Sequence, residues 1–232
     1  AYISGWRTGV AVTYATGSAD SKGRASQDVD IETYQGTVYG SYLMEQNYAL
    51  DLQAHVGLNN YESKRTSIGG MAYADFDSWH LALDAKLSRE FKLSNTMKVR
   101  PHVSLDYSYV DVDGYKERGS DANWIIKSNS EDALVLEFGG ELIIQPTENF
   151  RVKANLGIGY DFMTDDSSVR GSLAGLDVNI ENVAEPDELV IRAGLDVDVY
   201  TDEQFTVSVE YDIEARKDYK NQSGSVNALY KF

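Results

Sequence analysis

The residues best suited to acid–base chemistry are His80, Asp84, His102 and Asp106, which form two His/Asp pairs with the same four-residue spacing. An imidazole beside a carboxylate can activate water for hydrolysis. If the two segments pair about a turn near Leu93, His80 faces Asp106 and Asp84 faces His102. The same residues are also expected in a polar wall without catalytic activity, in which opposite charges hold neighbouring strands together. We favour the wall, and we predict no catalytic residue and no enzymatic activity.

Later segments repeat this pattern of charges on a polar face. Glu137 and Glu141 share the polar face of one segment, and Arg151 and Lys153 share the polar face of the next. We interpret these side chains as an electrostatic lattice that lines a hydrated lumen, whereas His55 appears alone on its face. The predicted lumen lining is His80, Asp84, His102, Asp106, Glu137, Glu141, Arg151, Lys153 and Arg192.

No spacing among His80, His102 and Asp106 enforces the tetrahedral geometry of a metal site, and the chain has no cysteine. We therefore predict no metal and no cofactor. The acidic long segments, such as 111–121, carry no spacing of the EF-hand type. We interpret them as solvated loops, with a Ca²⁺ site as the weaker alternative.

Composition limits the classes of function. The 232 residues carry 37 acidic and 21 basic side chains, for a formal net charge of −16. No basic stripe is left to neutralise phosphates, so we expect no nucleic-acid partner. The absence of cysteine excludes a disulfide scaffold and thiol chemistry. Sixteen tyrosines stand among the aromatic residues, beside seven phenylalanines and three tryptophans.

Alternation of apolar and polar residues dominates the chain, and helical periodicity is almost absent. Tyr48, Leu50, Leu52, Ala54, Val56 and Leu58, for example, recur at every second position. Such alternation predicts ten strands, centred on residues 6–14, 34–42, 48–58, 79–87, 99–109, 134–144, 150–160, 189–199, 205–213 and 226–232.

The connections alternate between short and long, which is typical of an up-and-down antiparallel barrel with two unlike ends. Short turns are expected at 45–47, 93–95, 146–149 and 202–203. Long polar loops are expected at roughly 16–30, 62–75, 110–125 and 164–187. At about 3.3 Å per residue and a tilt near 40°, ten residues span the roughly 25 Å apolar band of an outer-membrane barrel.

Aromatic residues gather at both ends of the apolar stripe, as expected for two membrane interfaces. One predicted girdle lies at the short-turn end and includes Tyr42, Tyr48, Phe150 and Phe205. The other lies at the long-loop end and includes Tyr14, Tyr61, Tyr109 and Tyr160. We therefore predict an all-β transmembrane barrel rather than a soluble sandwich.

Several motifs carry a resemblance to a known family. The chain contains Gly5-Trp6-Arg7-Thr8-Gly9 with Tyr14 behind it, then Asp30, Tyr34 and Tyr39-Gly40 in order. Pro101, Leu105 and Tyr107 precede Gly114-Tyr115-Lys116-Glu117-Arg118-Gly119, and the chain ends on Phe232. In this order the motifs resemble the C-terminal translocator β-domain of autotransporters (type V secretion), over essentially the whole chain 1–232.

The resemblance implies an outer-membrane barrel that anchors an N-terminal passenger and translocates it to the cell surface. It implies a bacterial outer-membrane location, with the lipid, lipopolysaccharide, periplasmic chaperones and barrel insertion machinery as partners. The aromatic end formed by Ala228, Tyr230 and Phe232 resembles the insertion signal read by that machinery. The family usually has twelve strands and a helix within the pore, so ten strands suggest a fragment. A free-standing barrel, such as an omptin-like protease, porin or adhesin, is the alternative.

Overall fold

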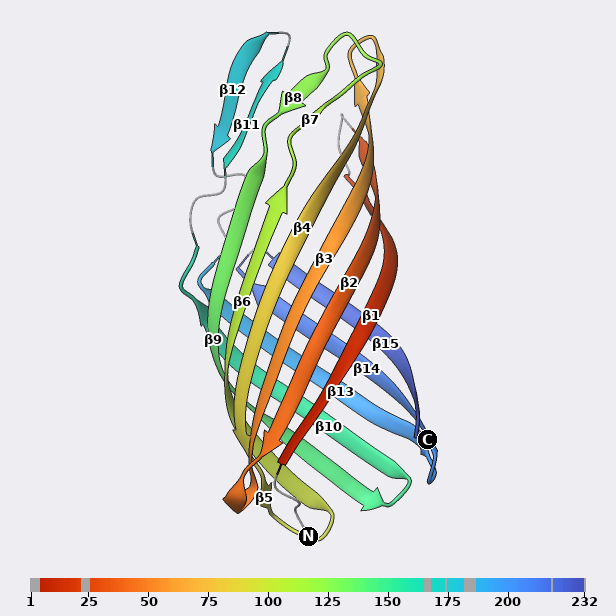
Figure 1. Cartoon of the computed structure of the whole chain (residues 1–232), viewed down its shortest axis with the longest axis vertical. Coiled ribbons are helices and arrows are strands. Elements are labelled where there is room, and N and C mark those ends of the chain that lie inside the picture. Colours follow the sequence, from red (N-terminus) through yellow and green to blue (C-terminus); the bar gives the residue numbers. More distant parts are fainter. Residues whose placement is uncertain are drawn as a thin grey trace.

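A computed structural model describes residues 5–21, 26–164, 168–173, 175–181, 187–217 and 219–231. Ten long strands form one continuous antiparallel sheet in sequence order (Figure 1). They are β1 (Gly5–Asp20), β2 (Gln27–Leu43), β3 (Tyr48–Ser67), β4 (Gly70–Arg89), β6 (Met97–Val112), β9 (Asn129–Thr147), β10 (Phe150–Asp161), β13 (Leu189–Thr201), β14 (Phe205–Arg216) and β15 (Tyr219–Tyr230). The ten-strand, up-and-down prediction is confirmed.

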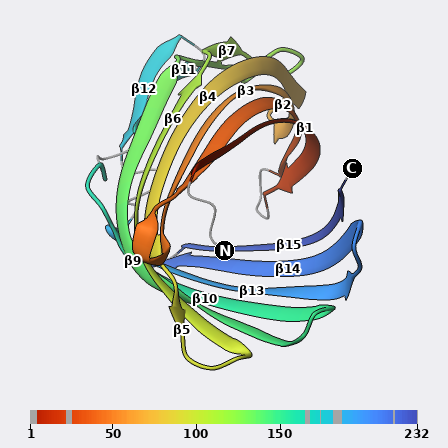
Figure 2. The ribbon, with the colours of Figure 1, turned by 60° about the horizontal axis from the view of Figure 1, so that its bottom comes forward.

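The sheet curls on itself, with β1 and β15 as its two edges (Figure 2). Within the described residues, neither edge strand pairs with a second neighbour. Short turns gather at one end of the sheet, where a single 3-10 turn, η1 (Glu45–Asn47), joins β2 to β3. The short strand β5 (Phe91–Lys92) pairs with β6 at this end.

The strands run further beyond the apolar band than the sequence predicts. β3 and β4 are each 20 residues long and meet in a two-residue turn at Ile68 and Gly69. β1 and β2 pair as far as Asp20 and Asp28. The predicted loops at 62–75 and 16–30 are therefore mostly strand. The signal fails there because residues 16–20 and 62–67 are mostly polar or small on both faces, and the apolar residues of 71–76 fall on both faces, so no apolar stripe marks the continuing strand.

The described parts of the two longest connections also contain strands. β7 (Tyr115–Lys116), β8 (Trp124–Ile126), β11 (Ser168–Leu173) and β12 (Leu176–Glu181) form a second, four-stranded sheet in the order β12-β11-β8-β7. This sheet lies at the end opposite the short turns (Figure 1). An antiparallel bridge between Tyr73 and Arg118 connects it to β4. We call it the distal sheet.

The two faces of the curled sheet differ in chemistry. One face exposes large apolar side chains such as Val10 (77% exposed) and Leu156 (64% exposed). The other face carries the side chains that are buried although polar, including Asn59, Ser104 and Glu137. A water-soluble sheet buries its apolar face instead. The exposed apolar band thus marks the outer face, and the polar face lines the concave interior.

Candidate functional site

Arg192 on β13 lies at the centre of the charged interior. Its Nη1 lies 2.8 Å from Oδ2 of Asp106 on β6 and 3.2 Å from Oε2 of Glu137 on β9. Its Nε lies 2.9 Å from Oε2 of Glu214 on β14. His102 extends the cluster, because its Nε2 lies 3.2 Å from Oε1 of Glu137. One guanidinium thus connects three strands besides its own, which is possible only on the concave face.

The predicted pairing of β4 with β6 is wrong by four residues. His80 lies opposite Val110, Asp84 opposite Asp106, and Ser88 opposite His102. Strand pairing does not stop at Arg89, because β5 continues it, and the tight turn lies at 93–96 with Met97 O accepting from the amides of Leu93 and Ser94. The predicted contacts His80–Asp106 and Asp84–His102 therefore do not form in this register.

Glu141, Arg151 and Lys153 are ion-paired as well. Glu141 contacts Arg100 and Lys86. Arg151 lies 3.0 Å from Asp198, and Lys153 lies 2.7 Å from Asp196. The partners Asp196 and Asp198 are not among the predicted lining residues, although their period-two spacing on β13 indicates one common face.

A second polar network joins β2, β3 and β4. His55 is not alone, because its Nε2 lies 3.1 Å from Asp84 and its Nδ1 lies 3.0 Å from the hydroxyl of Thr37. His80 contacts Gln35 instead, at 3.1 Å. Carboxylate, imidazole and hydroxyl are the groups of a hydrolytic triad. Amides of Gln35 and Gln53 also contact the ring nitrogens of His55, however, so the ring is enclosed by structural partners.

The interior holds an open cavity of about 580 Å³ whose lining includes Asp84, His102, Asp106, Glu137 and Arg192. A neighbouring cavity of about 320 Å³ continues past the cluster to β15. Across the described ranges, no group of three or more His, Asp or Glu side chains is arranged to hold a metal ion. The arrangement gives the interior a hydrated wall of paired charges that can orient polar groups placed beside it.

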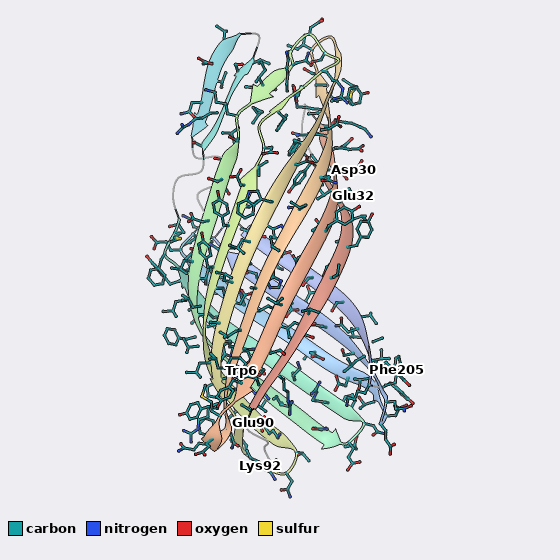
Figure 3. All side chains as sticks on the ribbon, in the orientation of Figure 1. Trp6, Asp30, Glu32, Glu90, Lys92 and Phe205 are labelled. Atoms are coloured by element: carbon teal, nitrogen blue, oxygen red, sulfur yellow. The ribbon has the colours of Figure 1, made fainter. Side chains whose placement is uncertain are left out.

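Aromatic residues lie on the outer face at both ends, often as cross-strand pairs. Trp6 contacts Tyr42, Tyr14 contacts Tyr34, and Trp79 contacts Tyr109, with ring centroids 5.1–5.2 Å apart. Phe150, Tyr160 and Phe205 are exposed on this face, and Tyr48 lies two residues before Leu50 on the same face. In Figure 3, Trp6 and Phe205 lie toward the short-turn end, and Asp30 and Glu32 toward the other.

Tyr61 is the one predicted girdle residue that does not lie on the outer face. Its ring stacks on Phe76 at 4.8 Å, and Phe76 stacks on Tyr115 of the distal sheet at 4.3 Å. Its hydroxyl lies 3.2 Å from that of the buried Ser78, on the polar face. The odd residues of β3 point inward, so the assignment of Tyr61 to the membrane interface is wrong.

Beside this stack, Arg65 anchors the distal sheet. Its Nε and Nη2 donate to the two carboxylate oxygens of Glu117 at 2.9 and 2.6 Å. The amide of Trp124 also donates to Glu117. Burial alone would raise the pKa of the Glu117 carboxyl, but these donors hold that pKa below its usual value. The hydrogen bonds to Glu117 likewise raise the pKa of Arg65.

One further interior feature was missed by the sequence analysis. The ring of Tyr39 lies directly over Gly9, in the space that a Cβ atom at this position would occupy. Glycine in the middle of a strand is the available signal for such a close approach.

At the C-terminal end, Ala228 and Tyr230 lie on the edge strand β15, whereas Phe232 lies outside the described residues.

None of the helices in the described part of the chain has the length and hydropathy to cross a membrane.

The fold is similar to that of three solved autotransporter domains. The translocator domain of autotransporter NalP from Neisseria meningitidis matches with a TM-score of 0.75 and 19% identity, over 97% of this chain and 74% of that one. The β-domain of the Bordetella autotransporter BrkA matches with a TM-score of 0.60 and 13% identity, over 98% and 92%. The transport unit of AIDA-I from Escherichia coli matches with a TM-score of 0.51 and 9% identity, over 98% and 84%.

A comparison with curated protein sequences finds no match. The family model described as the autotransporter beta-domain, in contrast, matches residues 1–212. Sequence and fold therefore agree, and the chain belongs to the autotransporter beta-domain family.

Proposed function

We propose that this chain is an outer-membrane translocator that anchors a polypeptide passenger and lets it cross to the cell surface, without enzymatic activity of its own. The observation that carries the proposal is that the apolar face of the sheet points outward and the polar face inward, the reverse of a water-soluble sheet. Apolar side chains such as Val10 and Leu156 are exposed outward, while Arg192 and its carboxylates face inward. In a bilayer, the outer face contacts lipid, and the strands between the two edge strands pair their backbone groups with both neighbours.

Family membership supports the outer-membrane location, because the matched solved structures are translocator and transport units of autotransporters. Lipid and lipopolysaccharide then contact the aromatic ends of the outer face. The charged interior supplies a hydrated path for the passenger. Its ion pairs fix the side chains in place, so a passing chain meets polar groups that are already satisfied.

The two edges suggest how the barrel is completed. β1 and β15 each present a row of unpaired backbone donors and acceptors. Pairing of further strands, or of the barrel insertion machinery, with these edges would satisfy that row by strand addition. We propose that the strand containing Ala228 and Tyr230, together with Phe232, is the segment that the insertion machinery reads, after delivery by periplasmic chaperones.

A secretion assay tests the translocator role. A signal peptide and a reporter domain are placed upstream of the chain within its full reading frame, and external protease is added to intact bacteria. We expect the reporter to be cleaved from outside while the chain migrates as a folded, heat-modifiable barrel. A matched variant lacking residues 219–232 should lose both properties. A reporter that stays inside although the barrel is folded would contradict translocation and support a free-standing barrel.

A further inference from the structure

Arg89 occupies an unusual position at the end of β4. It is the cross-strand partner of Tyr48, and it shares the outer face with Leu87 and Phe91. The guanidinium carbon lies 4.8 Å from the ring centroid of Tyr48 and 4.7 Å from that of Phe91. Its Nη1 donates to the Tyr48 hydroxyl oxygen at 3.3 Å. The charged group is therefore held between two aromatic rings on the face that is otherwise apolar.

The charge of Arg89 is not neutralised by the protein. Six other arginines lie within ion-pair distance of a carboxylate, namely Arg65, Arg100, Arg118, Arg151, Arg192 and Arg216. In the described part of the chain, Arg89 has no such pair. Its Nε is buried without a hydrogen-bond partner. A guanidinium with aromatic neighbours on both sides and no anion is an incomplete ion-binding arrangement.

The position along the strand identifies the environment that must supply the anion. Glu90 and Lys92, which follow Arg89, lie at the short-turn end near Trp6 (Figure 3). This end carries the aromatic residues of one predicted membrane interface. Side chains at that depth on the outer face meet lipid headgroups rather than acyl chains or bulk water. The anion available at this level of a bilayer is the phosphate of a phospholipid.

We propose that Arg89 and Tyr48 form a binding site for the phosphate group of a phospholipid at the short-turn end of the barrel. The inference rests on the membrane placement given under the proposed function. The planar guanidinium can donate two parallel hydrogen bonds to a phosphate, which an ammonium group cannot match. Because Tyr48 accepts from Arg89, its own hydroxyl hydrogen is free to donate to the same phosphate. The two flanking rings restrict the rotamers of Arg89 before the lipid arrives, which lowers the entropic cost of binding.

Native mass spectrometry of the detergent-folded full chain tests this site. Dioleoyl phosphatidylglycerol is the probe, and monogalactosyl diacylglycerol, which has the same tails without phosphate, is the comparator. We expect Arg89→Gln to weaken retention of the first phosphatidylglycerol about fivefold, the effect of one basic residue at a membrane surface. Arg89→Lys should lose part of the affinity, because it keeps the charge but not the planar fork. Arg118→Gln, at the distal end, is the matched control and should leave retention unchanged.

Three results would overturn the site: equal retention by wild type and Arg89→Gln, equal loss in Arg118→Gln, or equal binding of the phosphate-free lipid. Heat-modifiable migration of each variant is measured in parallel, so that loss of folding is not read as loss of binding. Should Arg89→Gln fail to fold, Arg89→Lys and Tyr48→Phe still decide the matter, because each removes donors and keeps the packing. Failure of the proposed function is distinguishable, since a chain that is not a membrane barrel would retain neither lipid.

Discussion

Replacing Arg192 by methionine should destabilise the folded barrel, because the change leaves three carboxylates facing one another without their shared cation. Arg192 joins β13 to Asp106, Glu137 and Glu214 at 2.8–3.2 Å. Breaking a buried ion pair on one side costs about 3–5 kcal/mol. Arg192 is about one third exposed, whereas the Glu137 side chain is only 9% exposed. We therefore discount the full value and expect a loss of about 2–4 kcal/mol.

Urea unfolding of the barrel in lipid vesicles, followed by tryptophan fluorescence, measures this loss. With an m-value of about 2–3 kcal/mol per molar urea, the midpoint should fall by roughly 1 M. Arg118→Met is the matched control, because the Arg118–Asp75 pair has side chains that are 66% and 60% exposed. That control should change stability by about 0–1 kcal/mol. Adding Glu137→Gln to Arg192→Met should restore part of the loss through coupling. Equal effects of Arg192→Met and Arg118→Met would refute the reasoning.

Two further predictions follow from particular contacts. Gly9→Ala should cost about 0.5–1.5 kcal/mol, because the new Cβ forces the outer end of the Tyr39 ring off its rotamer. Gly36→Ala, where nothing lies within 4 Å, should have little effect in the same urea assay. The ion pair between Glu117 and Arg65 should hold the distal sheet in place at neutral pH and release it in acid, since the pKa of Glu117 is lower in the folded chain. A depressed pKa gives stability that is present above the unfolded value and lost as pH falls through the folded value. Amide protection factors near residues 115–126, corrected for the intrinsic exchange rate, should therefore fall in acid, below the usual carboxyl pKa range. Glu117→Gln should remove this pH dependence, and an unchanged acid response in that variant would contradict the assignment.

Strand number, order and the direction of each face could be read from the sequence, because a two-residue period is a local property. The same period predicts that His102, Asp106 and Glu137 share one face, as they do. The pairing register of neighbouring strands was harder to predict from the sequence. The strand after Arg89 continues through Phe91 and Lys92, and a shift of the turn by two residues moves each partner by four. Alternation alone carries no information on where a polar turn begins.

Contacts between distant strands could not be predicted from the sequence. Arg192 and Asp106 are 86 residues apart, and their meeting depends on the curl of the whole sheet. The distal sheet was hidden for another reason. β7, β8, β11 and β12 are two to six residues long, too short for a period to emerge from a polar background. Tyr61 was misplaced although the period set by Leu50 to Leu58 puts the odd residues of β3 on the polar face; its aromatic type and its position beyond the apolar stripe were given more weight than that period.

The charges of the interior suit a passage better than a receptor. A site that retains a ligand presents groups left unsatisfied until the ligand arrives, as Arg89 does on the outer face. Arg192, Arg151 and Lys153 are each paired instead with carboxylates of the same chain. A polypeptide moving past these pairs would have to break one protein contact for each it forms, so no single position binds it strongly. Conduction through any pore requires such weak, distributed contacts, and the ion-paired interior provides them without giving up the stability of the wall.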